Sequence, residues 1–594
     1  MDRKETYGKY LELRKQLIAE RNTNGFWTGR LSSSALSTSV AIVALKVANN
    51  YFDSERIDSG FDWLCHNINA DGGFGDTAGS VSNVSTTLLC YAAVKFCQTE
   101  GNGQHALNAM EKWLSCRGIT FDSESVTGSI LELYGKDRTF SIPILSMLTL
   151  CGVIPASSIE KVPILPFELT LLSASFYRFV NLQVVSYALP ALIGVGIYLH
   201  KHREKRLFRR GLYRNLFIKP AIDKLNSMVP ASGGFLEAIP LTGFVAMCLM
   251  ASGERQNPTV IKGLEFLRNQ QRADGSSPID TDLSTWVTTL SVKAFGPDLK
   301  EVLDEDQIAI LRTHLLELQF KTIHPFNSAK PGGWGWTSYS GSVPDADDTP
   351  GTILALLEMY IGSNDELAAI GNGCNWLTSL QNKDGGFPTF CRGWGKLPFD
   401  KSCADLTGHA LLALLKTAEK LHEDISPELL DKIDKSIGKA IDFLTMHQSD
   451  KGAWLPLWFG NQQTDDKTSP VYGTSKVCVY LSDCLAFHRP GSEFTERLSG
   501  LVNKAQNYLL LEQNIDGSWG GKKDVPGTIE ETSLAISALA SAHEEACMRG
   551  IGWINKRENL TPAPIGLYFA LLWYDEKMYP LIYYTEALRR FSVH

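Results

Sequence analysis

A helix–turn–helix motif that recurs along the chain constrains its fold more than any other feature. In each copy a helical stretch ends in an aromatic residue followed by leucine, and a polar stretch then leads to a glycine and usually to another aromatic residue. Such a unit cannot bury its apolar stripe alone and must stack on copies of itself. The copies begin at Trp63, Phe266, Trp376, Phe443 and Tyr508, with a shorter copy at Arg21.

The repeat predicts an all-α protein in which paired helices close into an α/α barrel, or toroid. The glycine of each copy suits the turn that ends a helix. Barrels of this kind also serve as prenyltransferase subunits and as binding modules, so the repeat indicates the architecture but not the activity. A chain of 594 residues exceeds one core of ordinary size, and two or more domains are expected.

Composition narrows the class of protein. With 44% hydrophobic residues, 21% charged residues and a net charge of -8, the chain is typical of a folded globular protein. It lacks the basic excess of a nucleic-acid binder, so no nucleic-acid partner is expected. The 12 cysteines form no CxxC pair, which predicts reduced thiols and no metal site. No motif for a redox or nucleotide cofactor is present, and none is expected.

Three carboxylates stand together just before an apolar helical stretch, in the string PDADDT that holds Asp345, Asp347 and Asp348. One interpretation is structural, because aspartates near a helix start cap free amides and suit the backbone dipole. The other is chemical. Crowded carboxylates in a poorly solvated site cannot all ionise, and one that keeps its proton becomes a competent acid.

The acid string, its lead-in PGGWGW and the repeats together resemble squalene-hopene cyclases and oxidosqualene cyclases, the class II terpene cyclases with DxDD and QW motifs. The likeness extends over nearly the whole chain. It implies two α/α barrels, a catalytic one formed by residues 1–22 with 284–594 and an inserted one formed by residues 23–283. It also implies that Asp347, the middle carboxylate, donates a proton to an alkene.

A second segment, DLTGHALLAL, places Asp405 and His409 four residues apart on one helix face. It resembles the DVTAHVLE segment of the cyclases. The resemblance implies that His409 hydrogen-bonds to Asp347 as an imidazolium, which leaves the other oxygen of Asp347 more acidic, and that Asp405 orients His409.

Aromatic residues are suited to a ring-forming cascade, because their faces stabilise a desolvated cation by about 2 kcal/mol or more without offering a nucleophile. Leu567 and Leu571 stand where the family carries cavity aromatics, and STWVTTLSVKAF lacks the acid that usually follows its tryptophan. Glu237 fits either a site that holds a terminating water or the surface. The resemblance places these aromatic residues in the substrate cavity: Trp286, Trp334, Trp336, Phe390, Trp458, Tyr472 and Tyr568.

Residues 163–214 carry the signs of a membrane-dipping segment. The string PILPFEL resembles the segment before the nonpolar plateau of the cyclases, and a basic cluster follows it. Val180 to Leu199 is almost long enough to cross a bilayer, but Asn181, Gln183 and Pro190 interrupt it. We expect monotopic attachment to the cytoplasmic face of a membrane, with contact to lipid; a buried helix with a solvated basic loop is the alternative. The cluster is Lys201, Arg203, Lys205, Arg206, Arg209 and Arg210.

These features predict a protonation-initiated cyclase that converts squalene or a similar linear polyprene to a polycyclic triterpene such as hopene or hopanol. The resemblance leaves a homodimer open. A class II cyclase of a prenyl diphosphate and a non-catalytic helical scaffold are the alternatives. A protein prenyltransferase subunit is disfavoured, because no Asp-x-Cys string supplies its zinc site.

Overall fold

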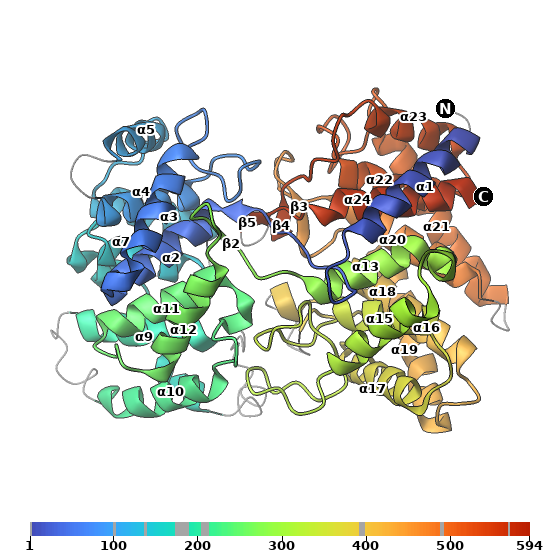
Figure 1. Cartoon of the computed structure of the whole chain (residues 1–594), viewed down its shortest axis with the longest axis horizontal. Coiled ribbons are helices and arrows are strands. Elements are labelled where there is room, and N and C mark those ends of the chain that lie inside the picture. The colour runs from blue at the N-terminus through green and yellow to red at the C-terminus, as the bar shows by residue number, and fades with distance from the viewer. Residues whose placement is uncertain are drawn as a thin grey trace.

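The computed structural model describes residues 3–98, 103–135, 139–172, 189–203, 213–390, 398–487, 492–567 and 571–593. Helices dominate it, and they gather into two lobes that lie side by side (Figure 1). The first helix, α1 (Arg3–Ala19), lies in the same lobe as the carboxyl terminus, and the chain then crosses to build the other lobe. The predicted all-α class is confirmed.

The lobe at the left of Figure 1 has an inner ring of helices in which each contacts the next: α2, α4, α7, α9 and α11. The helices α3, α5, α6, α10 and α12 pack outside this ring. The bounds are α2 (Ala35–Ala48), α3 (Ser54–His66), α4 (Val84–Cys97), α5 (Gln104–Ser115), α6 (Ser123–Tyr134), α7 (Ser141–Leu150), α9 (Leu189–His202), α10 (Asn215–Met228), α11 (Ile239–Ala251) and α12 (Pro258–Gln270).

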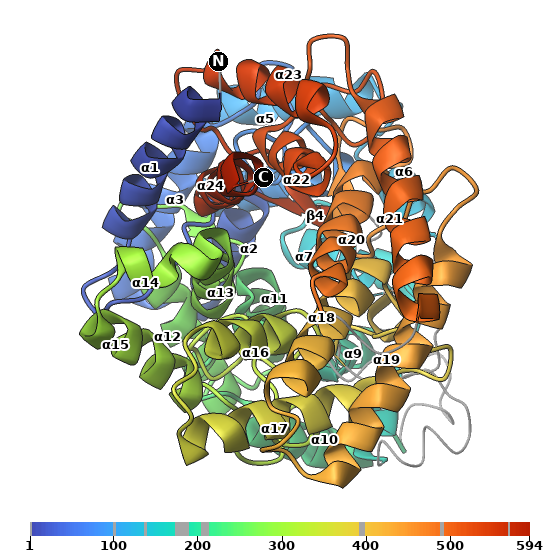
Figure 2. The same ribbon diagram turned by 90° about the vertical axis from the view of Figure 1, so that its right-hand side faces the viewer.

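The second lobe repeats this plan. Its inner ring runs α13, α16, α18, α20, α22, α24 and back to α13, and the outer helices α15, α17, α19, α21, α23 and α1 surround it (Figure 2). Every residue of α22 is buried, as suits a helix with neighbours on all sides. The bounds are α13 (Ser284–Phe295), α14 (Leu299–Val302), α15 (Glu305–Glu317), α16 (Asp348–Glu358), α17 (Asn364–Leu380), α18 (Ala404–Lys420), α19 (Pro427–His447), α20 (Pro470–Leu485), α21 (Ser492–Glu512), α22 (Ile529–Leu539), α23 (Glu544–Asn555) and α24 (Met578–Val593).

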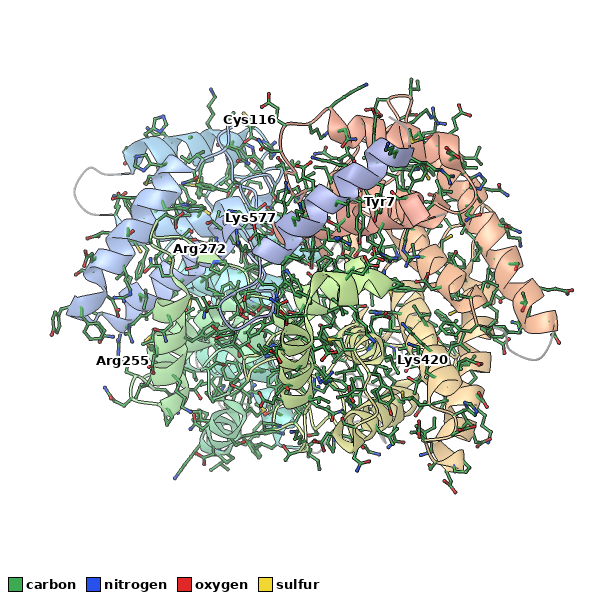
Figure 3. All side chains as sticks on the ribbon, turned by 45° about the vertical axis from the view of Figure 1, so that its right-hand side comes forward. Tyr7, Cys116, Arg255, Arg272, Lys420 and Lys577 are labelled. Carbon is green, nitrogen blue, oxygen red and sulfur yellow. The ribbon has the colours of Figure 1, made fainter. Side chains whose placement is uncertain are left out.

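Short strands pair within each lobe, and hydrogen bonds hold the segment between α1 and α2 to both lobes. Strand β1 (Ser33–Ser34) pairs antiparallel with β2 (Ser277–Pro278), and β4 (Ile565–Leu567) pairs antiparallel with both β3 (Phe459–Asn461) and β5 (Leu572–Tyr574). Arg272, labelled in Figure 3, donates to the Ser33 hydroxyl at 2.8 Å. The backbone amide of Lys577, also labelled there, donates to the Arg30 carbonyl at 3.3 Å. The chain between α1 and α2 is thus held by both lobes.

The recurring motif owes its form to hydrogen bonds that tie each turn to a neighbouring helix. Gln381 Nε2 donates to the carbonyls of Gly385 at 2.8 Å and Ser436 at 2.9 Å. Gly385 has φ +92°, and a Cβ there would lie 2.2 Å from the Lys439 carbonyl oxygen, so the turn requires glycine. Tryptophan supplies a second tie in several copies, through an indole nitrogen that donates to a helix carbonyl. These tryptophans are Trp27, Trp334, Trp454 and Trp519.

The two lobes enclose two separate hydrophobic cores. One contains buried residues of α1 together with residues from Trp286 to Phe591, and the other runs from Leu31 to Ile279 with a few later residues. Leu283, Trp336, Trp458 and Tyr574 pack against both cores. We propose that the domains are the predicted ones, residues 1–22 with 284–594 and residues 23–283.

The predicted membrane segment is described only in part, since residues 173–188 and 204–212 lie outside the described ranges together with Lys205, Arg206, Arg209 and Arg210. Lys201 donates to the Ser252 carbonyl at 2.6 Å, and Arg203 donates to the Ile159 carbonyl at 3.2 Å. The side chains of Lys201 and Arg203 are therefore hydrogen-bonded to backbone carbonyls of the protein. Within the described ranges, no helix has both the length and the apolar character that crossing a membrane requires.

The amide ties predict a measurable loss of stability when one is removed. Gln381→Met keeps the side-chain volume but leaves the buried carbonyls of Gly385 and Ser436 without this donor, which costs about 1–3 kcal/mol. Urea unfolding followed by circular dichroism measures the change. The matched control is Gln104→Met, since Gln104 is exposed and, among the described residues, donates only to exposed Asn108; its effect stays within about 0.5 kcal/mol. Equal stability of the two variants would contradict the account of the motif.

Candidate active site

The start of α16 separates the roles of the three clustered carboxylates. Asp345 accepts hydrogen bonds from the backbone amides of Asp347 at 2.8 Å and Asp348 at 2.7 Å. Asp347 is the residue before the helix, and its side chain caps no amide. The structural interpretation of the motif therefore holds for Asp345, while the carboxylate of Asp347 is free for another role.

Burial keeps this cluster from ionising fully. It raises the pKa of Asp345 to about 7, against the opposing effect of the two amide hydrogen bonds. Burial also raises the pKa of Asp348 well above its usual value, and the charges of Asp345 and Asp347 raise it further. Since like charges this close oppose one another, the cluster retains a proton at neutral pH.

His409 holds the middle carboxylate. Its Nδ1 lies 2.7 Å from Asp347 Oδ1, and its side chain is 2% exposed against 18% for Asp347. The imidazole stacks on Tyr480, with ring centroids 4.6 Å apart and an interplanar angle of 8°, and meets the edge of Trp286 at 6.3 Å. The predicted pairing of His409 with Asp347 is therefore present in the structure.

The charge state of His409 differs from the expected one. Burial lowers its pKa, Asp347 raises it in part, and the cations Lys476 and Lys293 lower it further. The site thus favours a neutral imidazole at pH 7, which can still donate its Nδ1–H to Asp347. The imidazolium that the resemblance implied is disfavoured first by burial and then by the two lysines on neighbouring helices.

Asp405 lies one turn before His409 on α18 and is buried. Its carboxylate accepts a hydrogen bond from the Cys403 thiol, and Cys403 Sγ accepts one from the Leu457 amide at 3.1 Å. Burial raises the pKa of Asp405 to about 6. No direct hydrogen bond joins Asp405 to His409 in the part of the chain that the structure describes, and the predicted orienting role stays a prediction.

The acids open onto an apolar cavity of about 350 Å³. The lining comes from both lobes, with Leu36, Leu89, Phe140, Ile144 and Phe244 on one side and Trp286, Trp336, Phe390, Trp458 and Tyr579 on the other, and the carboxylates Asp345, Asp347 and Asp348 beside them. Among the described lining residues the only charged groups are carboxylates. The cavity therefore suits an apolar molecule that receives a proton at one end.

Four of the predicted aromatic residues line this cavity: Trp286, Trp336, Phe390 and Trp458. Phe390 lies at their centre, with its ring centroid 6.0 Å from Trp336 and 5.6 Å from Trp458, the latter edge to face. Leu567 and Leu571 also line it. Leu567 and Leu571 thus present aliphatic side chains where the family pattern has aromatic rings, while Tyr574 of β5 also lines the cavity.

Two of the remaining predicted aromatic residues do not line the cavity, and a third is not described. Trp334 does not line the cavity, because it is fully buried and its Nε1 donates to the Leu315 carbonyl at 2.7 Å as a repeat tryptophan. Tyr472 is fully buried behind the wall, with its ring 4.7 Å from that of Phe459, which lines the cavity. Tyr568 lies outside the described residues.

Glu237 is fully buried, so the surface interpretation was wrong. Its Oε1 accepts hydrogen bonds from the Ser232 hydroxyl at 2.6 Å and the Gly341 amide at 2.5 Å, and burial raises its pKa to about 7. Leu236 and Ala238, on either side of it, line the cavity, but Glu237 does not. The backbone of Glu237 has φ +53°, in the left-handed region.

Sequence reasoning missed three polar residues at this site. Asp280 lines the cavity, and Trp336 Nε1 lies 3.4 Å from its Oδ1. The Tyr579 hydroxyl lies 3.0 Å from Trp286 Nε1. Lys476 is buried in α20. Lys476 could have been identified from the sequence, because it is the single charged residue in the run PVYGTSKVCVYL.

Comparisons with known proteins agree with this geometry. The squalene-hopene cyclase N-terminal domain model matches residues 11–234, and the C-terminal domain model matches residues 283–563. A squalene hopane cyclase of Aspergillus fumigatus is 22% identical over 84% of this chain and 75% of its own length. Enfumafungin synthase of Hormonema carpetanum is 26% identical over 42% of this chain, which corresponds to 19% of that protein.

The fold is also found among solved structures. An ent-copalyl diphosphate synthase from Streptomyces platensis superposes with a TM-score of 0.59 at 16% identity, covering 99% of both chains. At that identity the likeness concerns the fold alone. The family domains, by contrast, together match most of the sequence, including the acid cluster and His409. The chain therefore belongs to the squalene-hopene cyclase family of class II terpene cyclases.

Proposed function

We propose that this chain protonates a terminal double bond of squalene or a similar linear polyprene and closes it into a polycyclic triterpene such as hopene or hopanol. The observation that carries the proposal is the position of Asp347. Asp345 accepts the helix amides, whereas Asp347 caps none, lines the apolar cavity and is held by His409 at 2.7 Å.

The reaction begins when protonated Asp347 transfers its proton to one alkene carbon. The pi electrons form the new C–H bond, and the neighbouring carbon becomes a tertiary cation. Further double bonds attack in turn, each forming a C–C bond and passing the charge along the chain. Trp336, Phe390 and Trp458 present ring faces that stabilise such a cation by about 2 kcal/mol or more each in a dry site. Loss of a proton or capture of water ends the cascade.

Asp347 suits the first step for physical reasons. An alkene is a very weak base, so its protonation requires a strong acid in a water-poor site. Proton transfer leaves Asp347 as a carboxylate, and the Nδ1–H of His409 is placed to hydrogen-bond to that charge. Retention of both residues in hydrogen-bond contact disfavours the alternative of a non-catalytic scaffold.

A hydrocarbon substrate is favoured over a prenyl diphosphate. A diphosphate group requires cationic side chains or a bound metal ion to balance its charge. The described residues that line the cavity include no Lys, Arg or His, and their charged members are carboxylates, which would repel a phosphate. The similar fold of a copalyl diphosphate synthase does not bear on this choice.

We also propose that the protein attaches to a membrane through the surface around residues 163–214, because squalene dissolves in the bilayer. Exposed apolar side chains flank the described parts of this segment. Ile164 is 60% exposed, Leu172 37%, Tyr213 49% and Leu216 75%. Helix α10 contacts the short helix Phe167–Leu171, which brings the last three of these residues to one region.

Asp347→Asn removes the transferable proton while preserving shape. The variant is expected to lose about 10³-fold or more of the cyclisation rate, with thermal stability unchanged because Asp347 caps no amide. Gas chromatography with mass spectrometry of lipid extracts after incubation with squalene measures the product. Asp384→Asn, in an exposed repeat turn, is the matched control and retains full activity. Cyclic product from the Asp347 variant at the wild-type rate would rule out this acid.

The raised pKa values predict the direction of the pH dependence. Asp347 donates from a cluster that must hold a proton, so kcat is highest below the pKa of about 7 at Asp345 and falls as the pH rises through it, because the cluster then loses a proton. Asp345→Asn keeps the helix cap but removes a negative neighbour, so the descending limb moves to lower pH. A pH–rate profile from pH 5 to 8.5 checks both statements. A rate that climbs steadily across this range would contradict them.

Membrane attachment predicts a defined loss of lipid binding. Changing Ile164 and Leu216 together to Gln removes two exposed apolar side chains and weakens binding to anionic phospholipid vesicles by about tenfold or more in a flotation assay. Ile515→Gln is the control, since Ile515 is 95% exposed in a repeat turn of the other lobe. Equal flotation of the double variant and wild type would place the lipid-binding surface elsewhere.

A further inference from the structure

Helix α20 carries two charged residues: Asp483 near its end pairs with Arg590, whereas Lys476 lies in its buried middle. Lys476 is 2% exposed, and its Nζ has no hydrogen-bond partner among the residues that the structure describes. Buried cations are normally paired, because an ammonium removed from water without compensation is costly. This lysine therefore requires a physical explanation.

Aromatic rings surround the ammonium. Lys476 Nζ lies 5.3 Å from the ring centroid of Trp286, 5.5 Å from Tyr480, 5.8 Å from Tyr583 and 6.0 Å from Tyr472. Ring faces attract a cation but do not neutralise it, in contrast to a carboxylate. The site can therefore hold a positive charge whose electric field no adjacent carboxylate neutralises.

Lys476 shares two of these rings with the acid-bearing pair. Tyr480 stacks on the His409 imidazole, and Trp286 packs against the same imidazole at an interplanar angle of 65°. His409 in turn holds Asp347. The ammonium and the histidine therefore contact the same two rings.

The other charged groups around this site have partners of their own. Lys293 on α13 lies 3.1 Å from Glu586 on α24, and Glu586 also pairs with Arg590 at 2.9 Å. Asp405 on α18 accepts from Cys403. The acids at the start of α22, Glu530 and Glu531, accept from a backbone amide and from Ser469, respectively. Lys476 is the cation of this group that no carboxylate contacts in the described residues.

We propose that Lys476 is a positioning residue that supplies the fixed positive charge behind the acid. It keeps His409 neutral, and it stabilises the Asp347 carboxylate that remains after proton transfer. No proton leaves Lys476 in this role. In cyclases with an imidazolium the histidine would carry that charge; here the lysine carries it, and the proposal rests on the cyclase function proposed above.

This placement also affects the path of the substrate cation. Trp286 and Tyr472 each face the ammonium, so their rings are occupied by one cation and a second would be repelled. The carbocation is accordingly stabilised at Trp336, Phe390 and Trp458. Positive charge at α20 therefore drives the migrating cation away from the acid, toward these three rings.

Lys476→Met tests the proposal, because methionine fills similar volume without charge. Three results are expected. The melting temperature rises, since an unpaired buried charge is removed, and the cyclisation rate falls about tenfold or more. The pKa of the His409 imidazole rises toward 6.5, as measured by ¹⁵N NMR of histidine-labelled protein in which His409→Gln assigns the signal. Lys416→Met, which removes a lysine on α18 paired with Glu358 at 2.9 Å, is the control that leaves His409 unchanged.

The results separate this proposal from the proposed function. An unchanged His409 titration in folded Lys476→Met protein would overturn it, and a lowered melting temperature would assign Lys476 a purely structural role. Lys476→Gln, which restores hydrogen-bonding capacity without charge, repeats the titration if the methionine variant does not fold. The NMR and melting measurements need no substrate, so they remain decisive even if wild-type protein cyclises no squalene, an outcome that would refute the proposed function alone.

Discussion

The two hydrogen bonds that Asp345 accepts at the start of α16 decide how the acid cluster works. A helix start leaves backbone amides without partners, and one carboxylate in this cluster must satisfy them. Because Asp345 does so, Asp347 is left with its side chain toward the cavity and toward His409. The same capping draws three carboxylates into a buried space, which forces some of them to remain protonated. Capping and acidity are thus two consequences of one arrangement.

The barrel supplies the rigid frame that this arrangement needs. Asp347 precedes α16, His409 belongs to α18, and the rings that enclose Lys476 come from α13, α20 and α24. All of these helices belong to the inner ring of one lobe, where each packs against the next. Amide ties such as that of Gln381 fix the turns outside the ring. The chemistry therefore depends on contacts between segments far apart in the sequence.

Much of the architecture could be predicted from the sequence, because the repeats impose a local pattern that leaves few ways to bury an apolar stripe. The pairing of Asp347 with His409 and the ring set of Trp286, Trp336, Phe390 and Trp458 also followed from motifs. Trp334 was misplaced, although its likeness to the repeat tryptophans Trp27, Trp454 and Trp519 could have shown that it ties a turn. The direction in which each side chain of such a motif points could not be predicted from the motif alone.

Other properties depend on three-dimensional surroundings. The lowered pKa of His409 arises from burial and from lysines on two other helices, which no motif around His409 encodes. Glu237 is buried because the loop that bears it takes a left-handed conformation beneath the cavity wall. The charge state and the burial of a residue depend on the packing of the whole protein. The local sequence determines only which residues a motif contains and how they are spaced.

Cyclisation of squalene in deuterium oxide tests the central claim most directly. If protonated Asp347 starts the reaction, the acid exchanges with solvent between turnovers, and each cyclic triterpene carries one deuterium on carbon that mass spectrometry detects. A cyclic product formed at the same rate without carbon-bound deuterium would show that the cascade begins without proton transfer from the protein, and it would contradict the account given for this site.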